Sequence, residues 1–243
     1  MIPSRLSLNV WGSLSVFTQP TLKVERFSYP VITPSAARGI FESIYWKPQF
    51  RWQITEIEVL KPIRYIALRR NEVKDRVPGA DTIVQWMTGK AEPAPLFADV
   101  TKDEVGTDTK GRTQRQTMAL KDVHYRLHAE IRPWPDQTDN LIAMEAQFRR
   151  RARAGQCAWM PYFGCREFPA YFELWDGGVE PPPVPIDMDI GWMLYDVFDL
   201  SRPGNDLSPP FITTFHANLK QGVLKVPPFE SLDVRKPGGG IHA

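Results

Sequence analysis

The first part of the chain has a segment in which polar and apolar residues alternate, followed by a segment with apolar residues at helical spacing. Residues 5–11 alternate polar and apolar side chains and predict a half-buried strand that ends at Gly12. After a loop that contains prolines, Thr33 and Pro34 have the character of a helix N-cap and a first helical residue. Apolar residues then recur at helical spacing, at Ala37, Ile40, Phe41, Ile44 and Tyr45. The pattern predicts a helix that ends before Pro48.

Extended segments dominate the next part of the chain. Apolar positions between Trp52 and Leu60 predict a second strand whose uneven spacing allows a bulge. Pro62 interrupts this strand, and residues 63–68 continue as another extended piece. Residues 71–111 hold few periodic apolar positions and many Gly, Pro, Asp and Thr residues. We expect a long loop or flexible insertion there, since loops of this length are usually functional or disordered.

Two further strands and a second helix follow. Residues 113–120 and 123–132 predict strands separated by a break at Lys121-Asp122. The apolar residues of the second strand share one face, and its polar residues share the other: His124, Arg126, His128, Glu130 and Arg132. Residues 139–153 predict a helix capped by Thr138 or Asp139 and ended by Gly155.

The order of these elements predicts the fold class. The alternation of strands and helices up to residue 155 resembles the split β-α-β, ferredoxin-like (RRM-like) plan. The rest of the chain reads as short aromatic strands, at residues 158–163, 170–175, 192–198, 211–217 and 223–226. We therefore expect an α+β protein with a ferredoxin-like domain over 1–155, the insertion around 71–111, a smaller β-rich domain over 156–230 and a flexible tail over 231–243.

Composition and charge narrow the range of possible functions only slightly. Hydrophobic residues make up 42% and charged residues 24% of the chain, as in an ordinary globular protein. The net charge of +2 is too small to indicate a nucleic-acid partner by itself. Cys157 and Cys165 lack the accompanying histidines of a zinc site, and we interpret them as reduced thiols. With no signal peptide and no apolar run near ~18 residues, we expect a cytoplasmic protein without a membrane partner.

The candidate catalytic residues are side chains that can act as acids or bases without a metal ion. The sequence has no Gly-rich phosphate loop, no H-E-x-x-H motif and no metal-binding carboxylate cluster, so we expect no metal and no cofactor. The strand face with His124 and His128 suits RNA cleavage by the RNA's own 2′-hydroxyl, with Lys121 as the cation beside the phosphate. A merely solvated strand face explains the same pattern.

Basic and aromatic residues supply candidate RNA contacts. Four arginines, Arg149, Arg150, Arg151 and Arg153, lie together at the end of the second predicted helix. They indicate either contacts with phosphates or favourable charge at a helix C-terminus. Trp46, next to Lys47 at the end of the first helix, is the aromatic residue best placed to stack on a base.

Four stretches carry a family resemblance. The first is the N-terminal strand with Gly12 and Phe17-Thr18, and the second is Tyr29-Pro30 followed by the run from Ser35 to Pro48 that ends in Glu-Ser-Ile-Tyr-Trp-Lys-Pro. The third is Leu120-Lys121-Asp122-Val123-His124-Tyr125, and the fourth is Tyr162-Phe163-Gly164-Cys165-Arg166-Glu167-Phe168. Together these stretches resemble the CRISPR-associated Cas-five family of RAMP proteins, subtype I-C branch. The resemblance implies a ferredoxin-like domain that binds RNA and carries the catalytic residues.

The resemblance also implies an activity and partners. It implies metal-independent endonuclease action on precursor CRISPR RNA within each repeat, near the base of its hairpin. The enzyme would keep the 5′ handle and join the backbone and large subunits of the type I-C interference complex. Double-stranded DNA is a further candidate partner. Some relatives in other subtypes do not cut RNA, so a non-catalytic subunit that binds the 5′ handle is an alternative, and a protein that binds only other proteins is a third.

The resemblance finally suggests site residues. It implies a catalytic Tyr, Lys and His, for which Tyr45, Lys121 and His124 match best, with His128 as the competing histidine on the same strand face. The expected RNA-binding residues are Trp46, Lys47, Arg115, Arg126, Arg149, Arg150, Arg151 and Arg153.

Overall fold

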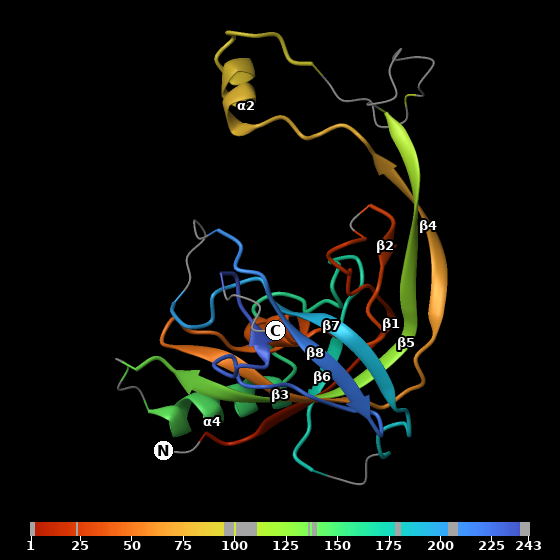
Figure 1. The fold of residues 1–243 in the computed structure, drawn as a ribbon. Helices are drawn as coiled ribbons and strands as arrows, with labels where there is room; N and C mark the ends of the chain where they lie inside the picture. Colours follow the sequence, from red (N-terminus) through yellow and green to blue (C-terminus); the bar gives the residue numbers. More distant parts are fainter. Residues whose placement is uncertain are drawn as a thin grey trace. The chain divides into compact units, whose positions relative to one another are not determined.

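The computed structural model describes residues 3–22, 24–94, 100, 111–135, 137, 140–177, 181–203 and 209–238. Its helices and strands, drawn in Figure 1, are β1 (Leu6–Ser15), β2 (Arg26–Phe27), α1 (Pro34–Ile44), β3 (Phe50–Val59), β4 (Tyr65–Val73), α2 (Ala80–Met87), β5 (Arg112–Pro133), α4 (Leu141–Arg153), β6 (Tyr171–Leu174), β7 (Met188–Asp196), β8 (Thr213–Lys220), β9 (Val223–Lys225) and β10 (Val234–Arg235). The chain forms two compact units, residues 1–66 with 118–243 and residues 67–117.

The strands form one sheet, which makes the protein α+β. Seven strands lie in the order β10-β8-β9-β3-β5-β1-β6, while β2 and β4 pair with β5 and β7 pairs with β8. The ladders that join β1 to β5, β1 to β6 and β3 to β5 are all antiparallel. The chain enters β1, passes through α1 to β3, returns along β5 and reaches β6 after α4. β1 and β5 are therefore the central strands of this part of the sheet.

The expected boundary at residue 155 does not separate two units in the structure. β6 pairs with β1, and β9 pairs with β3, so strands from both sides of residue 155 share backbone hydrogen bonds. Both segments belong to the same compact unit. The predicted tail also takes part in the sheet, because Val234 of β10 is buried and pairs with Phe215 of β8. Residues 239–243 lie outside the described residues.

Helix α1 forms as its sequence predicts. The Thr33 hydroxyl accepts a hydrogen bond from the backbone N–H of Ala36 at 3.3 Å, and Pro34 occupies the first turn. The apolar side of α1 is buried against β3 and α4. The ring of Phe41 lies 4.9 Å from that of Trp52 on β3 and 5.4 Å from that of Phe148 on α4. This aromatic cluster is fully buried and joins α1 to β3 and α4.

The predicted strands and the second helix differ in detail. The bulge allowed in β3 occurs between Ile54 and Glu56. The two strands expected on either side of Lys121-Asp122 form one strand, β5, and the predicted break is a local distortion at Asp122, whose φ is 52°. The cap of α4 is Asn140, whose side-chain oxygen accepts from two backbone N–H groups. Caps at Thr138 or Asp139, which lie outside the described residues, were therefore predicted too early.

Two further segments correct the expectations. Residues 71–111 were predicted as a loop, but they include the end of β4 and the exposed helix α2, both within the second unit. Residues 95–99 and 101–110 lie outside the described part. Residues 158–163 form no strand, and Tyr162 makes only an isolated bridge with Pro169. None of the helices in the described part is long and apolar enough to cross a membrane.

Candidate nucleic-acid interface

The C-terminal end of α1 forms a hollow with α4. It has a volume of about 570 Å³, and its lining includes Tyr45, Trp46, Lys47 and Arg151. Tyr45 is the C-cap of α1, and its backbone oxygen accepts a hydrogen bond from the indole N–H of Trp52 at 2.8 Å. The Tyr45 residue is 4% exposed, whereas Trp46 is 53% exposed. The structure thus brings together four of the predicted site residues, and we call this place the basic hollow.

The arginines at the end of α4 divide between two sides of the helix. Arg149 and Arg153 form ion pairs with Asp176 at 3.5 and 2.6 Å. Arg150 donates to the Gln147 side chain, and Arg151 lines the basic hollow. A helical run of arginines spreads around the axis in this way because successive residues are about 100° apart. Arg151 is therefore the arginine of this run that lines the hollow together with Tyr45.

Lys121 and His124 lie at a different place, three residues apart on β5 where it pairs with β1. His124 is opposite Trp11, and Lys121 is opposite Leu14. The His124 ring packs edge-on against Trp11, with 6.1 Å between ring centroids, and Trp11 stacks on Tyr171 of β6 at 6.4 Å. The His124 residue is half-buried, and the Nε2 atom of its ring is buried.

The structure does not bring Tyr45 to Lys121 and His124. The ring of Tyr45 lies 5.5 Å from that of Phe50, which pairs with Pro133 at the far end of β5. His124 precedes Pro133 by nine residues on that strand, which is roughly 30 Å at ~3.3 Å per residue. One phosphate cannot contact both places in this arrangement.

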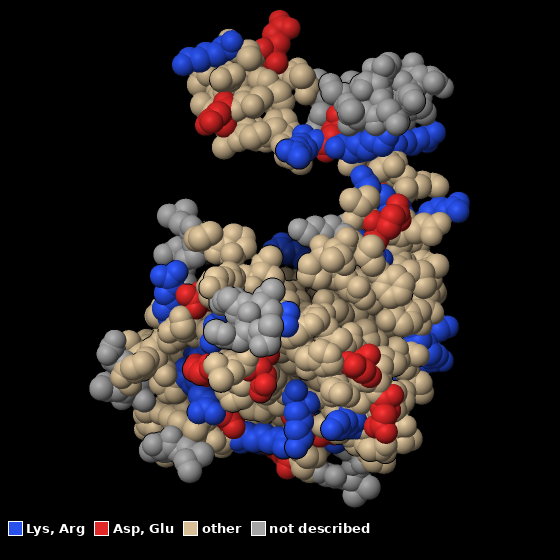
Figure 2. Space-filling model, viewed as in Figure 1, with Lys and Arg blue, Asp and Glu red and all other residues tan. Residues whose placement is uncertain are grey.

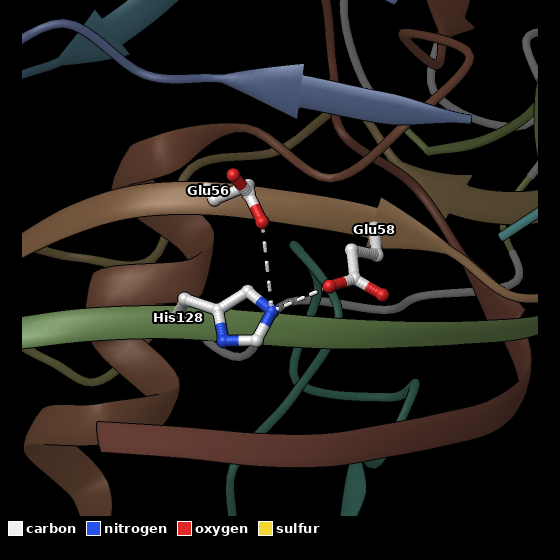
Figure 3. Close-up of side chains that lie close together, drawn as sticks. All are labelled: Glu56, Glu58 and His128. Carbon is white, nitrogen blue, oxygen red and sulfur yellow. Dashed lines mark hydrogen bonds and ion pairs between the residues drawn. The ribbon is translucent and has the colours of Figure 1, made fainter. Parts of the chain in front are cut away.

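His128, the competing histidine, belongs to a buried network. Figure 3 shows its ring directed at Glu56 and Glu58 of β3. Its Nε2 lies 2.8 Å from a Glu58 oxygen, and its Nδ1 lies 2.7 Å from the Ser7 hydroxyl. The His128 side chain is completely buried, and both ring nitrogens have partners. His128 therefore holds β1, β3 and β5 together and is not available to a substrate at the surface.

Arg126 belongs to the same network, which corrects its assignment as an RNA contact. Its guanidinium donates to Glu58 at 2.6 Å and stacks 4.5 Å from the ring of Trp175, and its side chain is only 7% exposed. Burial alone raises the pKa of the Glu58 carboxyl. The hydrogen bond from His128 and the charge of Arg126 outweigh burial, so this pKa lies below its ordinary value of 4.5.

Glu56, Glu58 and His128 also have the ligand types of a metal site, with candidate atoms within 4.8 Å of one another. The sequence did not reveal this cluster, because its members come from two strands. Each carboxylate already has a cation beside it, since Arg5 bonds Glu56 and Arg126 bonds Glu58, both at 2.6 Å. A metal ion would have to displace these guanidinium groups, so the donor set fits an ion-pair network better than a metal site.

Charge is dispersed over the face of the molecule that Figure 2 draws. Figure 2 shows basic and acidic side chains interspersed over the face in view, in agreement with the small net charge. Arg115, a predicted RNA contact in the second unit, forms an ion pair with Glu72 at 3.2 Å. The basic hollow and the His124 region are therefore the two places where predicted site residues gather.

The amino-acid sequence is similar to a known protein family and to named relatives. A family model described as CRISPR-associated protein (Cas_Cas5), of the Cas5d type, matches residues 5–227. A protein of Mannheimia succiniciproducens named CRISPR pre-crRNA endoribonuclease Cas5d is 40% identical, over 96% of this chain and 99% of that protein. A protein of Thermus thermophilus with the same name is 39% identical, over 92% of each chain.

Solved structures show the same fold. A crystal structure of a CRISPR-associated protein has a TM-score of 0.61 at 20% identity and covers 97% of this chain and 98% of its own. A Streptococcus mutans protein described as functionally uncharacterized, SMU1763c, has a TM-score of 0.59 at 19% identity, with 97% and 99% covered. Because the family model and the relatives span nearly the whole sequence, this chain belongs to the Cas5d family of CRISPR-associated proteins.

Proposed function

We propose that the protein is an endoribonuclease that cleaves precursor CRISPR RNA within the repeat. The observation that carries the proposal is the 40% identity, over nearly the full length of both chains, to a protein named as a pre-crRNA endoribonuclease. The basic hollow supports it, because an exposed tryptophan beside Lys47 and Arg151 suits contacts with a base and with phosphates. The order of β6, β1, β5 and β3 supports a ferredoxin-like core for this domain.

The proposed chemistry uses the RNA's own 2′-hydroxyl. A base removes the hydroxyl proton, the oxygen attacks the adjacent phosphorus, and the 5′-oxygen leaves with a proton from an acid. This step needs no metal ion, so we propose metal-independent cleavage. The product that carries the 5′ handle would stay bound, and the protein would join the backbone and large subunits of the type I-C interference complex, where double-stranded DNA is a further candidate partner.

His124 and Lys121 are the proposed residues at the reacting phosphate. The histidine would exchange a proton with the RNA, and the lysine would stabilise the negative charge that develops at the phosphate. Tyr45, the third residue that the family resemblance suggests, lies in the basic hollow. We propose that Tyr45 acts there on another part of the same RNA, because the two places are too far apart to share one phosphate.

The decisive experiment is cleavage of the repeat RNA with EDTA present. Cleavage should persist in EDTA and should stop when the 2′-hydroxyl at the cut is replaced by hydrogen, because the nucleophile is then missing. Cutting of the deoxy substrate would refute the mechanism. Binding of the repeat without any cutting would favour the alternative, a non-catalytic subunit that holds the 5′ handle.

Single substitutions test the assignment of residues. His124→Ala should slow cleavage by ~10²- to 10⁴-fold while RNA binding stays within a few-fold of the parent. His216→Ala is a matched control, because His216 is a half-exposed histidine on β8 with no assigned role. If Tyr45→Phe abolishes cleavage while His124→Ala does not, the cut takes place in the basic hollow and the assignment to His124 is wrong.

A further inference from the structure

A second hollow adjoins the basic hollow, and its walls are aromatic. It has a volume of about 340 Å³, and four rings on its lining stand out: Trp46, Trp134, Trp159 and Phe198. Three of them are unusually open to solvent, with exposed fractions of 53% for Trp46, 51% for Trp159 and 52% for Phe198. Exposed aromatic residues that gather around one concavity mark a binding site more often than scattered ones do. We call this place the aromatic cleft.

The rings are held in place before any ligand arrives. The backbone N–H of Phe198 donates to the Asp196 carboxylate at 3.0 Å, and the guanidinium of Arg38 lies 5.3 Å from the ring centroid of Phe198. Arg38 is itself fixed by Asp196 at 2.7 Å. The indole N–H of Trp134 donates to the Pro48 oxygen at 3.0 Å. Because these rings are already ordered, a flat ligand would lose little binding energy to their ordering.

The segment that carries Trp159 is also tied to α1. The backbone N–H of Ala158 donates to the oxygen of Ser43 at 2.6 Å, which anchors the residue before Trp159. Trp46 follows Tyr45, whose backbone N–H donates to Phe41 at 3.0 Å. Both tryptophans therefore project from fixed backbone while their rings remain about half exposed.

The charges in the aromatic cleft are matched, so the cleft favours an uncharged ligand. Arg38 pairs with Asp196 and Glu42, and Arg202 pairs with Asp199 at 3.0 Å. Arg51 pairs with Glu230. A phosphate in the cleft would meet carboxylates as well as guanidinium groups. A planar, neutral ring would instead gain stacking and burial against the exposed aromatic faces.

Continuity with the basic hollow indicates what the planar ring is. Trp46 lines both hollows, with Lys47 and Arg151 on the basic side and Trp159 and Phe198 on the aromatic side. A nucleotide has the same division, because its phosphate is anionic and its base is flat and neutral. Bases can stack on protein side chains only where the RNA is unpaired. Basic side chains on one side of Trp46 and aromatic rings on the other therefore suit a nucleotide of single-stranded RNA.

We propose that the aromatic cleft binds one unpaired nucleobase of the repeat RNA against Trp159 and Phe198, with the adjoining phosphates in the basic hollow. This inference rests on the proposed function, since it names how the same RNA is held. It assigns base-stacking contacts to residues that the family resemblance did not single out. The cleft is a binding site and not the place of the proton transfers.

The test couples protein variants with altered RNA. The repeat RNA and a series with one abasic nucleotide at each unpaired position are titrated against the parent, Trp159→Leu and Phe198→Leu. These variants remove the ring and keep an apolar side chain, so that part of the wall remains. We expect each variant to weaken binding of the native repeat by about 5-fold or more, within the ~5- to 150-fold range for loss of one stacked base.

The abasic series distinguishes a specific pocket from general weakening. For the parent, one abasic position should weaken binding by a similar factor. That same position should have a smaller effect in Trp159→Leu and in Phe198→Leu, because each variant keeps only one of the two stacking rings. Trp192→Leu is the matched control, because Trp192 is 45% exposed on β7 and is covered by Arg235, with 3.6 Å between its ring centroid and the guanidinium. It should bind every RNA like the parent.

Three results would overturn the inference. The first is native binding within twofold of the parent by both cleft variants. The second is an equal loss at every abasic position. The third is unchanged RNA binding together with lost association with other subunits, which would make the cleft a protein-binding surface. If the parent cleaves the repeat, each of these results removes the cleft assignment alone. If the parent neither binds nor cleaves, the proposed function itself fails.

Discussion

Removing the Glu58 carboxylate should cost the fold more than any surface ion pair. Glu58 accepts hydrogen bonds from Arg126 at 2.6 Å and pairs with His128 at 2.8 Å. The side chains of these three residues are 12%, 7% and 0% exposed. Glu58→Ala would leave a buried guanidinium and a buried imidazole without their acceptor. Breaking such a buried pair from one side costs ~3–5 kcal/mol, a large share of the ~5–15 kcal/mol by which domains are usually stable.

The assay is equilibrium unfolding in urea, followed by the fluorescence of the tryptophans, one of which, Trp175, stacks on Arg126. Glu130→Ala, on the neighbouring strand β5, is the matched control. Glu130 pairs with Arg132 at 2.6 Å, but the Arg132 side chain is 45% exposed. Loss of that pair should cost no more than about 1 kcal/mol. Equal midpoints and slopes for Glu58→Ala and Glu130→Ala would refute the argument from burial.

The same network predicts how stability depends on pH. The folded-state pKa of Glu58 lies below its ordinary value of 4.5, so the folded protein binds this proton less tightly than the unfolded chain does. The contribution of Glu58 to stability is therefore complete above about pH 4.5 and is lost as the pH falls through the folded-state value. Glu58→Gln should show a smaller loss of stability than the parent between pH 5 and pH 3, measured as the shift of the urea midpoint.

Three further outcomes follow from geometry. The double variant Lys47→Ala, Arg151→Ala should weaken RNA binding and reduce the slope of the logarithm of the binding constant against the logarithm of the salt concentration by up to ~2. Arg149→Ala should change this slope less, because the Arg149 side chain already pairs with Asp176. Gly12→Ala should destabilise the fold by ~1–3 kcal/mol, because the new Cβ would lie 2.9 Å from Phe163. Gly39→Ala, in α1 with no atom near the new Cβ, should stabilise it by ~0.5–1 kcal/mol in thermal unfolding.

Local signals in the sequence predicted local structure well. Thr33 and Pro34 predicted the start of α1 because a cap depends on neighbouring residues only. The bulge in β3 also showed in the spacing of its apolar residues. The cap of α4 was misplaced because several residues that can cap, including Asn140, stand together before that helix. The aromatic character of residues 158–163 was misleading, because Trp159 and Met160 are about half exposed and only Tyr162 makes a bridge, with Pro169.

Nonlocal contacts were much harder to predict. Nothing in the spacing of Glu58 and His128 shows that β3 and β5 place them together, so the buried network was missed and Arg126 was assigned to RNA. The aromatic cleft was missed for the same reason, since Trp46 and Phe198 are joined only by the fold. Tyr45, Trp46 and Lys47 of the basic hollow were singled out because they are adjacent in one motif, but the sequence did not place Arg151 beside them.

The central position of β1 has a consequence for synthesis of the protein. Leu6 pairs with Ala129, 123 positions later, and Leu8 also pairs with Leu174 of β6. At ~5–20 residues per second, the ribosome makes the partner strand β5 roughly 6–25 s after β1. Both edges of β1 stay unpaired for this time, although its apolar side chains are already present. The nascent chain therefore exposes an unpaired, aggregation-prone strand for seconds. The yield of folded protein in cells should depend on chaperones that bind short apolar segments.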